Sequence, residues 1–109
     1  MTTSKSPLLA KKTSEGLCLK PKGNLVASTV EGHRASMMKA IEKPGEKVVL
    51  DLSAVEQIDS LGITLVLGLF KSCQQAKASF AIVGVSADIM RVFRLFNLPK
   101  FFSITEAEA

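Results

Sequence analysis

The sequence predicts a single small α/β domain, in which short apolar strands alternate with amphipathic helices. The chain has 109 residues, of which 47% are hydrophobic and 22% are charged, and this size and composition are typical of one globular domain. Strand-like and helix-like segments follow one another in the order β, β, α, β, α, β, α, β. Because each helix returns the chain to start the next strand in the same direction, we expect parallel neighbours joined by right-handed crossovers.

The N-terminal part predicts a leader and a hairpin. Residues 1–14 are polar or basic and aperiodic, so we expect a flexible basic leader that contributes little to the fold, followed by the domain proper at residues 15–109. Two short strands, at residues 17–20 and 25–30, flank a Pro and a Gly-Asn pair, which is typical of a hairpin.

The middle of the chain predicts helix, strand and helix. Residues 31–43 place apolar side chains at helical spacing and end at a Pro-Gly stop signal. Residues 47–53 form an apolar run, as expected of an inner strand covered on both faces. Residues 61–77 are too long and apolar for a strand, and Ser60 is well placed as the N-cap of this helix, with Asp59 just before it.

The C-terminal part predicts a strand at residues 80–85, a helix that begins at Ser86 or Asp88, and a last strand at residues 101–104. The helix carries one apolar stripe, formed by Ile89, Val92, Phe93 and Phe96.

The positive charge of the chain lies in its N-terminal part. The net charge is +4, but residues 1–22 hold five lysines against one glutamate, whereas residues 23–109 hold nine charges of each sign. Nucleic-acid binding requires basic residues beside stacking aromatics. The chain has no Trp or Tyr, and its six Phe residues fall in apolar stripes that we expect in the core. We therefore expect no nucleic-acid partner.

The sequence lacks the motifs of common catalytic and metal sites. Cys18 and Cys73 have no zinc or redox spacing, and His33 is the one histidine of the chain, expected on a helix face near solvent. No phosphate-binding glycine loop is present. We expect no enzyme activity, metal or cofactor. The longest uncharged apolar segment, residues 61–70, is about half the ~20 residues that span a bilayer, so we expect a cytoplasmic protein without membrane insertion.

The most informative segment is the junction between the third strand and the second helix. A polar loop ends in Asp59 and Ser60, Gly62 follows, and the helix is then solidly apolar. This pattern, with a final helix followed by Leu-Pro-Lys-Phe-Phe, resembles the STAS domain family, whose bacterial single-domain members are anti-sigma factor antagonists. The resemblance covers residues 16–106 and implies a mixed sheet of about four to five strands with about three to four helices packed mainly on one face.

The resemblance also implies a phosphorylation switch at Ser60. In that family the serine after the aspartate is phosphorylated by a partner anti-sigma factor that is a serine kinase. Signalling members usually carry Ser or Thr at the next position, where this chain has Leu61. The implied partners are such a kinase, bound when Ser60 is unphosphorylated and released afterwards, and a serine phosphatase. The expected contact residues are Ile58, Asp59, Ser60, Leu61, Gly62 and Thr64, with the strand near residues 25–29.

Other interpretations stay open at this point. Ser60 on its own fits a plain N-cap, with Asp59 as a loop acid. A STAS domain also fits a non-phosphorylated subunit of an ABC-type lipid transporter, or a scaffold in a larger stress-signalling assembly. The sequence leaves monomer and dimer both open.

Overall fold

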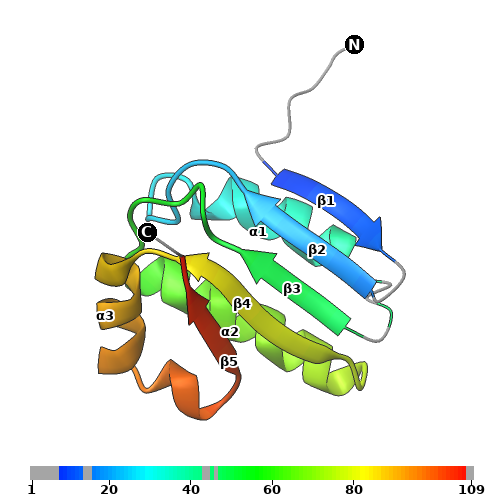
Figure 1. Ribbon diagram of the computed structural model, residues 1–109. Coiled ribbons are helices and arrows are strands. Elements are labelled where there is room, and N and C mark those ends of the chain that lie inside the picture. Colours follow the sequence, from blue (N-terminus) through cyan, green and yellow to red (C-terminus); the bar gives the residue numbers. More distant parts are fainter. Residues whose placement is uncertain (1–7, 14–15, 43–44, 46, 108–109) are drawn as a thin grey trace.

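The computed structural model, which describes residues 8–13, 16–42, 45 and 47–107, has a five-stranded sheet with helices on one side (Figure 1). Its elements are β1 (Leu8–Thr13), β2 (Gly16–Pro21), α1 (Val30–Ala40), β3 (Lys47–Asp51), α2 (Ser60–Gln75), β4 (Ser79–Val85), α3 (Ala87–Leu95), the 3-10 turn η1 (Leu98–Lys100) and β5 (Ser103–Glu106).

The sheet is mixed, as the sequence predicts. Its strands lie in chain order, β1-β2-β3-β4-β5. β1 pairs antiparallel with β2, and the three remaining pairs are parallel, each joined through a helix. The α/β class and the parallel strand–helix–strand units are therefore confirmed.

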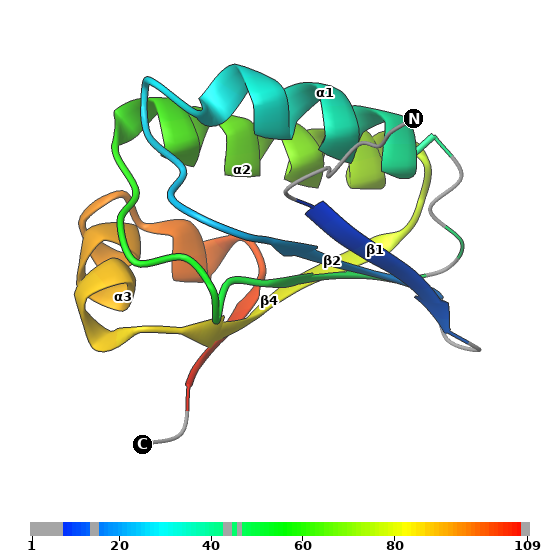
Figure 2. The same ribbon diagram turned by 90° about the horizontal axis from the view of Figure 1, so that it is seen from above.

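One face of the sheet carries the core. Figure 2 shows α1 and α2 side by side across that face, with α3 at one end of the sheet. Along β3, Val48 and Leu50 are buried beneath the helices, whereas Val49 and Asp51 are only half-buried. The prediction that this strand is covered on both faces is wrong, because both long helices pack on the same side.

The hairpin lies earlier in the chain than predicted. β1 pairs with β2 in a register that sets Ala10 opposite Leu19, so residues 8–13, expected in the leader, are an edge strand of the sheet. Residues 1–7 lie outside the described part. The predicted strand at residues 25–30 is wrong: the Thr29 hydroxyl accepts from the Val26 N–H (3.1 Å) and donates to the Asn24 carbonyl (2.6 Å). These local bonds favour a turn over strand pairing.

Three side chains differ from the predicted core. His33 is buried (3% exposed) on the inner face of α1, not near solvent, whereas Phe96 and Phe101 are 48% and 57% exposed. Phe101 falls in the turn that follows η1, so β5 begins at Ser103. Phe96 is the C-cap of α3, and Asn97 follows it in the left-handed region with φ 60°, so the buried stripe of this helix ends at Phe93.

We expect His33 to make the fold sensitive to mild acid. Burial lowers the pKa of His33 below its ordinary 6.5, against the opposing effect of a hydrogen bond with the Asn24 backbone, and Nδ1 has no partner in the described part of the chain. Below about pH 6.5 the unfolded chain then binds more protons than the folded chain. The free energy of unfolding therefore decreases as the pH is lowered, by at most about 1.4 kcal/mol per pH unit for one proton.

Urea unfolding between pH 7.5 and 5 measures this effect. The variant His33→Gln removes the titrating group and should show a flatter dependence over that range. Parallel curves for the two proteins would contradict the assignment to His33.

Candidate functional site

Asp59 caps helix α2 at the junction that the sequence singles out. Its Oδ1 accepts hydrogen bonds from the N–H groups of Leu61 (3.0 Å) and Gly62 (3.1 Å), and its own backbone is extended, as an N-cap requires. The prediction that Ser60 is the N-cap is wrong by one residue, and Ser60 is instead the first residue of the helix. A carboxylate at this end of a helix also complements the positive pole of the helix dipole.

The second oxygen of the same carboxylate holds a neighbouring loop. Asp59 Oδ2 accepts from the Ala27 N–H at 2.8 Å, across 32 positions of the chain. The N–H donors of Gly62, Ala27 and Leu61 lower the pKa of Asp59, against an opposing effect of desolvation. The carboxylate therefore stays ionised at neutral pH and ties the start of α2 to the loop that precedes α1.

Backbone pairing aligns these two loops. The Leu25 N–H donates to the Gln57 carbonyl (3.0 Å), and the Asp59 N–H donates to the Leu25 carbonyl (3.2 Å). Asn24 adds a side-chain link, because its Oδ1 accepts from the N–H groups of Glu56 (3.2 Å) and Gln57 (3.1 Å). The sequence predicts only a turn at Asn24. Its partners lie more than thirty positions away, so no local pattern could reveal them.

Gly62 makes this close approach possible. A Cβ on Gly62 would collide with the Leu25 carbonyl oxygen and would lie 2.6 Å from Ile58 Cγ1. The glycine is buried, so it shapes the junction and offers no surface to a partner. This differs from the expectation that Gly62 is a contact residue.

The exposed part of the site lies on the first turns of α2. Ser60 and Thr64 are exposed, one turn apart, and the Thr64 hydroxyl donates to the Ser60 carbonyl at 2.9 Å. Leu61 is 45% exposed and is one of four exposed large apolar side chains among the described residues. Ile58 is half-buried and packs against the core. The structure therefore brings the six predicted residues to one corner, with Ser60, Leu61 and Thr64 as its outer surface.

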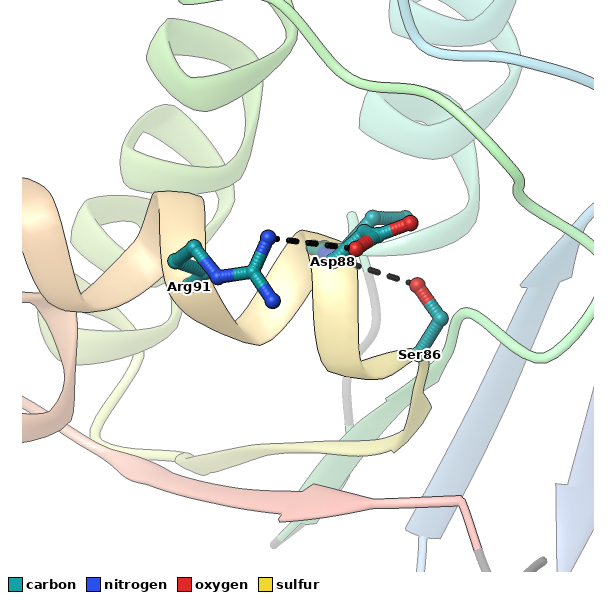
Figure 3. Close-up of polar contacts among 4 residues, drawn as sticks. Ser86, Asp88 and Arg91 are labelled. Atoms are coloured by element: carbon teal, nitrogen blue, oxygen red, sulfur yellow. Dashed lines mark hydrogen bonds and ion pairs between the residues drawn. The ribbon is translucent and has the colours of Figure 1, made fainter.

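An open groove of about 420 Å³ runs beside this corner, between the residue 56–59 loop and α3. Its apolar lining comes from Val26, Ile58, Ile89 and Val92, and its acidic residues are Glu56, Asp59 and Asp88. Figure 3 shows the α3 wall: Ser86 Oγ accepts from the Ile89 N–H (3.2 Å), and Asp88 pairs with Arg91 (3.3 Å). Ser86 is thus the N-cap of α3, which selects it over Asp88 as the start of this helix.

Other chemistry finds little support in the described residues. Within them, no three His, Cys, Asp or Glu side chains gather as a metal site would require. Cys18 and Cys73 are free thiols, and burial raises the pKa of Cys73 to about 11. No helix in the described ranges is long and apolar enough to cross a membrane.

Comparison with known proteins identifies the family. The STAS domain family model matches residues 8–109. An anti-sigma-B factor antagonist of Listeria monocytogenes is 30% identical over 88 residues, which cover 76% of this chain and 77% of the relative.

Solved structures share the fold. A crystal structure from Thermotoga maritima has a TM-score of 0.83 at 25% identity, covering 91% of this chain and 86% of the other. The anti-sigma factor antagonist SpoIIAA of Bacillus, in its unphosphorylated form, has a TM-score of 0.74 at 19% identity, covering 93% and 89%. SpoIIAA has also been solved in its phosphorylated form. This chain belongs to the STAS domain family.

We expect Gly62→Ala to destabilise the fold, by about 1–3 kcal/mol, because the added methyl overpacks the junction with Leu25 and Ile58. Gly68 is the matched control in the same helix, since a Cβ there would meet only Met38 Cε at an ordinary 3.5 Å. Gly68→Ala should be neutral or stabilising by up to about 1 kcal/mol, the helix propensity difference. Urea unfolding measures both, and equal effects of the two substitutions would refute the assigned role of Gly62.

Proposed function

We propose that this chain is a cytoplasmic anti-sigma factor antagonist, without enzyme activity of its own, that binds an anti-sigma factor serine kinase. In its unphosphorylated state it occupies the kinase and so frees a sigma factor for transcription. The observation that carries the proposal is the exposed Ser60 at the start of α2, directly after a capping Asp59. The Listeria relative, an anti-sigma-B factor antagonist by name, supports it.

The position of Ser60 suits a hydroxyl that a kinase must reach. Its side chain is exposed, and within the described part of the chain no group hydrogen-bonds to its hydroxyl. The kinase would bring ATP and Mg²⁺, and this chain would supply only the hydroxyl oxygen that accepts the phosphoryl group. A serine phosphatase would return the chain to its binding state.

Phosphorylation at this position changes the surface and leaves the fold in place. The N–H groups of Leu61 and Gly62 are already taken by Asp59, so a phosphate on Ser60 does not replace the cap. It adds roughly −1.5 to −2 charges next to an ionised carboxylate. Burying Leu61 against a partner would then require both charges to lose water, and that cost favours release.

SpoIIAA supports this mode of regulation, because that protein with the same fold is known in unphosphorylated and phosphorylated forms. The acceptor in this chain is followed by Leu61, which is exposed. An apolar side chain next to Ser60 gives the kinase a contact that loses water when the complex forms. Because that contact is desolvated, the complex becomes sensitive to a charge added nearby.

We expect one phosphorylation site. Incubation with the cognate kinase and ATP, followed by mass spectrometry, should place a single phosphate on Ser60, and Ser60→Ala should abolish it. Thr64→Ala removes an exposed hydroxyl one turn further along the same helix and is the matched control, which should still be labelled. Labelling of the Ser60→Ala variant would refute the assignment of Ser60 as the phosphorylation site.

We expect Ser60→Glu and Leu61→Ala to weaken kinase binding, the first by charge and the second by loss of apolar contact. A loss of ~3 kcal/mol for the first would weaken binding more than a hundredfold. Ser103→Glu places the same charge on an exposed serine of β5 and should bind as the native chain does. Calorimetric titration of the kinase measures all three.

A pull-down separates this proposal from the other two interpretations. Capture of a soluble kinase supports the switch, whereas capture of a permease–ATPase complex, or elution at very high mass, would favour the transporter subunit or the scaffold.

A further inference from the structure

The second half of α2 forms one wall of an open hollow of about 520 Å³. The hollow is lined by Leu67, Phe70, Lys71 and Gln74 of α2 and by Lys100 and Phe101 at η1. With a rise of 1.5 Å per residue, Phe70 lies roughly 15 Å along α2 from Ser60. The hollow is therefore separate from the junction at Ser60.

The apolar floor of the hollow packs against buried aromatic rings. The Phe70 ring lies 5.0 Å from that of Phe102 and 6.2 Å from that of Phe80, both of which are buried. Phe101 lies 6.3 Å from Phe70 and is 57% exposed. Aromatic rings at these separations contact one another favourably. The floor is thus preformed, and one of its rings remains open to solvent.

Two uncompensated cations stand at this apolar floor. Lys71 comes from α2 and Lys100 from η1, and both are exposed. The ion pairs among the described residues use Arg34, Arg91 and Arg94, and neither lysine has a carboxylate partner there. Gln74 adds an amide to the same lining. The combination of an aromatic floor with two cations from different elements is complementary to a ligand that is apolar at one end and anionic at the other.

We propose that this hollow binds a single-chain amphiphilic carboxylate, of the fatty-acid class. The carboxylate would lie between Lys71 and Lys100, within reach of the Gln74 amide, and the hydrocarbon chain would cover Phe70 and Phe101. A volume of about 520 Å³ falls within the roughly 300–1,000 Å³ of small-molecule sites.

The size of the hollow favours a small ligand over a protein surface or a membrane. A stable protein interface uses about 20–30 residues on each side, whereas this lining has six. The other exposed apolar side chains of this region, Leu95 and Phe96, do not line it. A planar membrane surface would reach the exposed Phe101 ring, whereas a single chain can also fill the concave part of the hollow over Phe70.

Titration with decanoate, kept below its micelle concentration, tests the proposal by amide chemical shifts. We expect saturable shifts at Phe70, Lys71 and Phe101. The double variant Lys71→Gln/Lys100→Gln should bind at least tenfold more weakly, and Phe101→Ala should also weaken binding. Lys12→Gln/Lys22→Gln removes the same charge from two exposed lysines on β1 and just after β2, at the opposite edge of the sheet, and should retain native affinity. Circular dichroism confirms that each variant folds.

Several outcomes would overturn the proposal. Decyltrimethylammonium has a ten-carbon chain and the opposite charge. Equal binding of that cation would show that the lysines do not discriminate between anionic and cationic head groups. The absence of saturation, or an equal loss in the two double variants, would also refute it. Saturation only with phosphatidylglycerol vesicles, or only with an acidic peptide, would assign the surface to a membrane or to a protein instead. None of these results depends on the kinase or on Ser60.

Discussion

The corner of the molecule that carries Ser60 depends on one carboxylate. Asp59 uses one oxygen to cap α2 and the other to hold the Ala27 N–H, so a single side chain fixes both the start of the helix and the loop beside it. The backbones of Leu25 and Gln57 then pair, and the Asn24 side chain accepts a further hydrogen bond from the Gln57 N–H between the same two loops. These bonds fix the backbone on either side of Ser60, whose side chain is exposed.

Because the helices cover only one face of the sheet, the outer side of α2 is left exposed at two separate places. Both long helices pack on the same face (Figure 2), and α2 buries Ile63, Val66 and Leu69 against it. Its first turn therefore projects Leu61 at one end, and its later turns meet η1 beside Phe101 at the other. Helix α2 thus separates the exposed Leu61 at its start from the hollow beside Phe101 near its other end.

The sequence predicted the elements whose signals are local. The apolar runs of β3 and β4 and the long helix α2 lie within a few residues of their predicted bounds, because the length of an uninterrupted apolar run is a signal carried by neighbouring residues. The predicted strand at residues 25–30 failed for the opposite reason. Its β-branched residues favoured a strand, but Thr29 bonds within its own turn, and a strand at residues 8–13 takes the place beside β2 instead.

By itself, the sequence determined the α/β class and the family resemblance, and it singled out Ser60 as the predicted phosphorylation site. Each of these rests on residues that are near one another in the chain. Only the tertiary structure decided that Asp59, not Ser60, caps the helix, that Gly62 is buried under Leu25, and that His33 lies in the core. It also placed Lys71 and Lys100 at one hollow. These outcomes depend on contacts between segments far apart in the sequence, where no spacing or propensity carries a signal, and only packing sets which atoms meet.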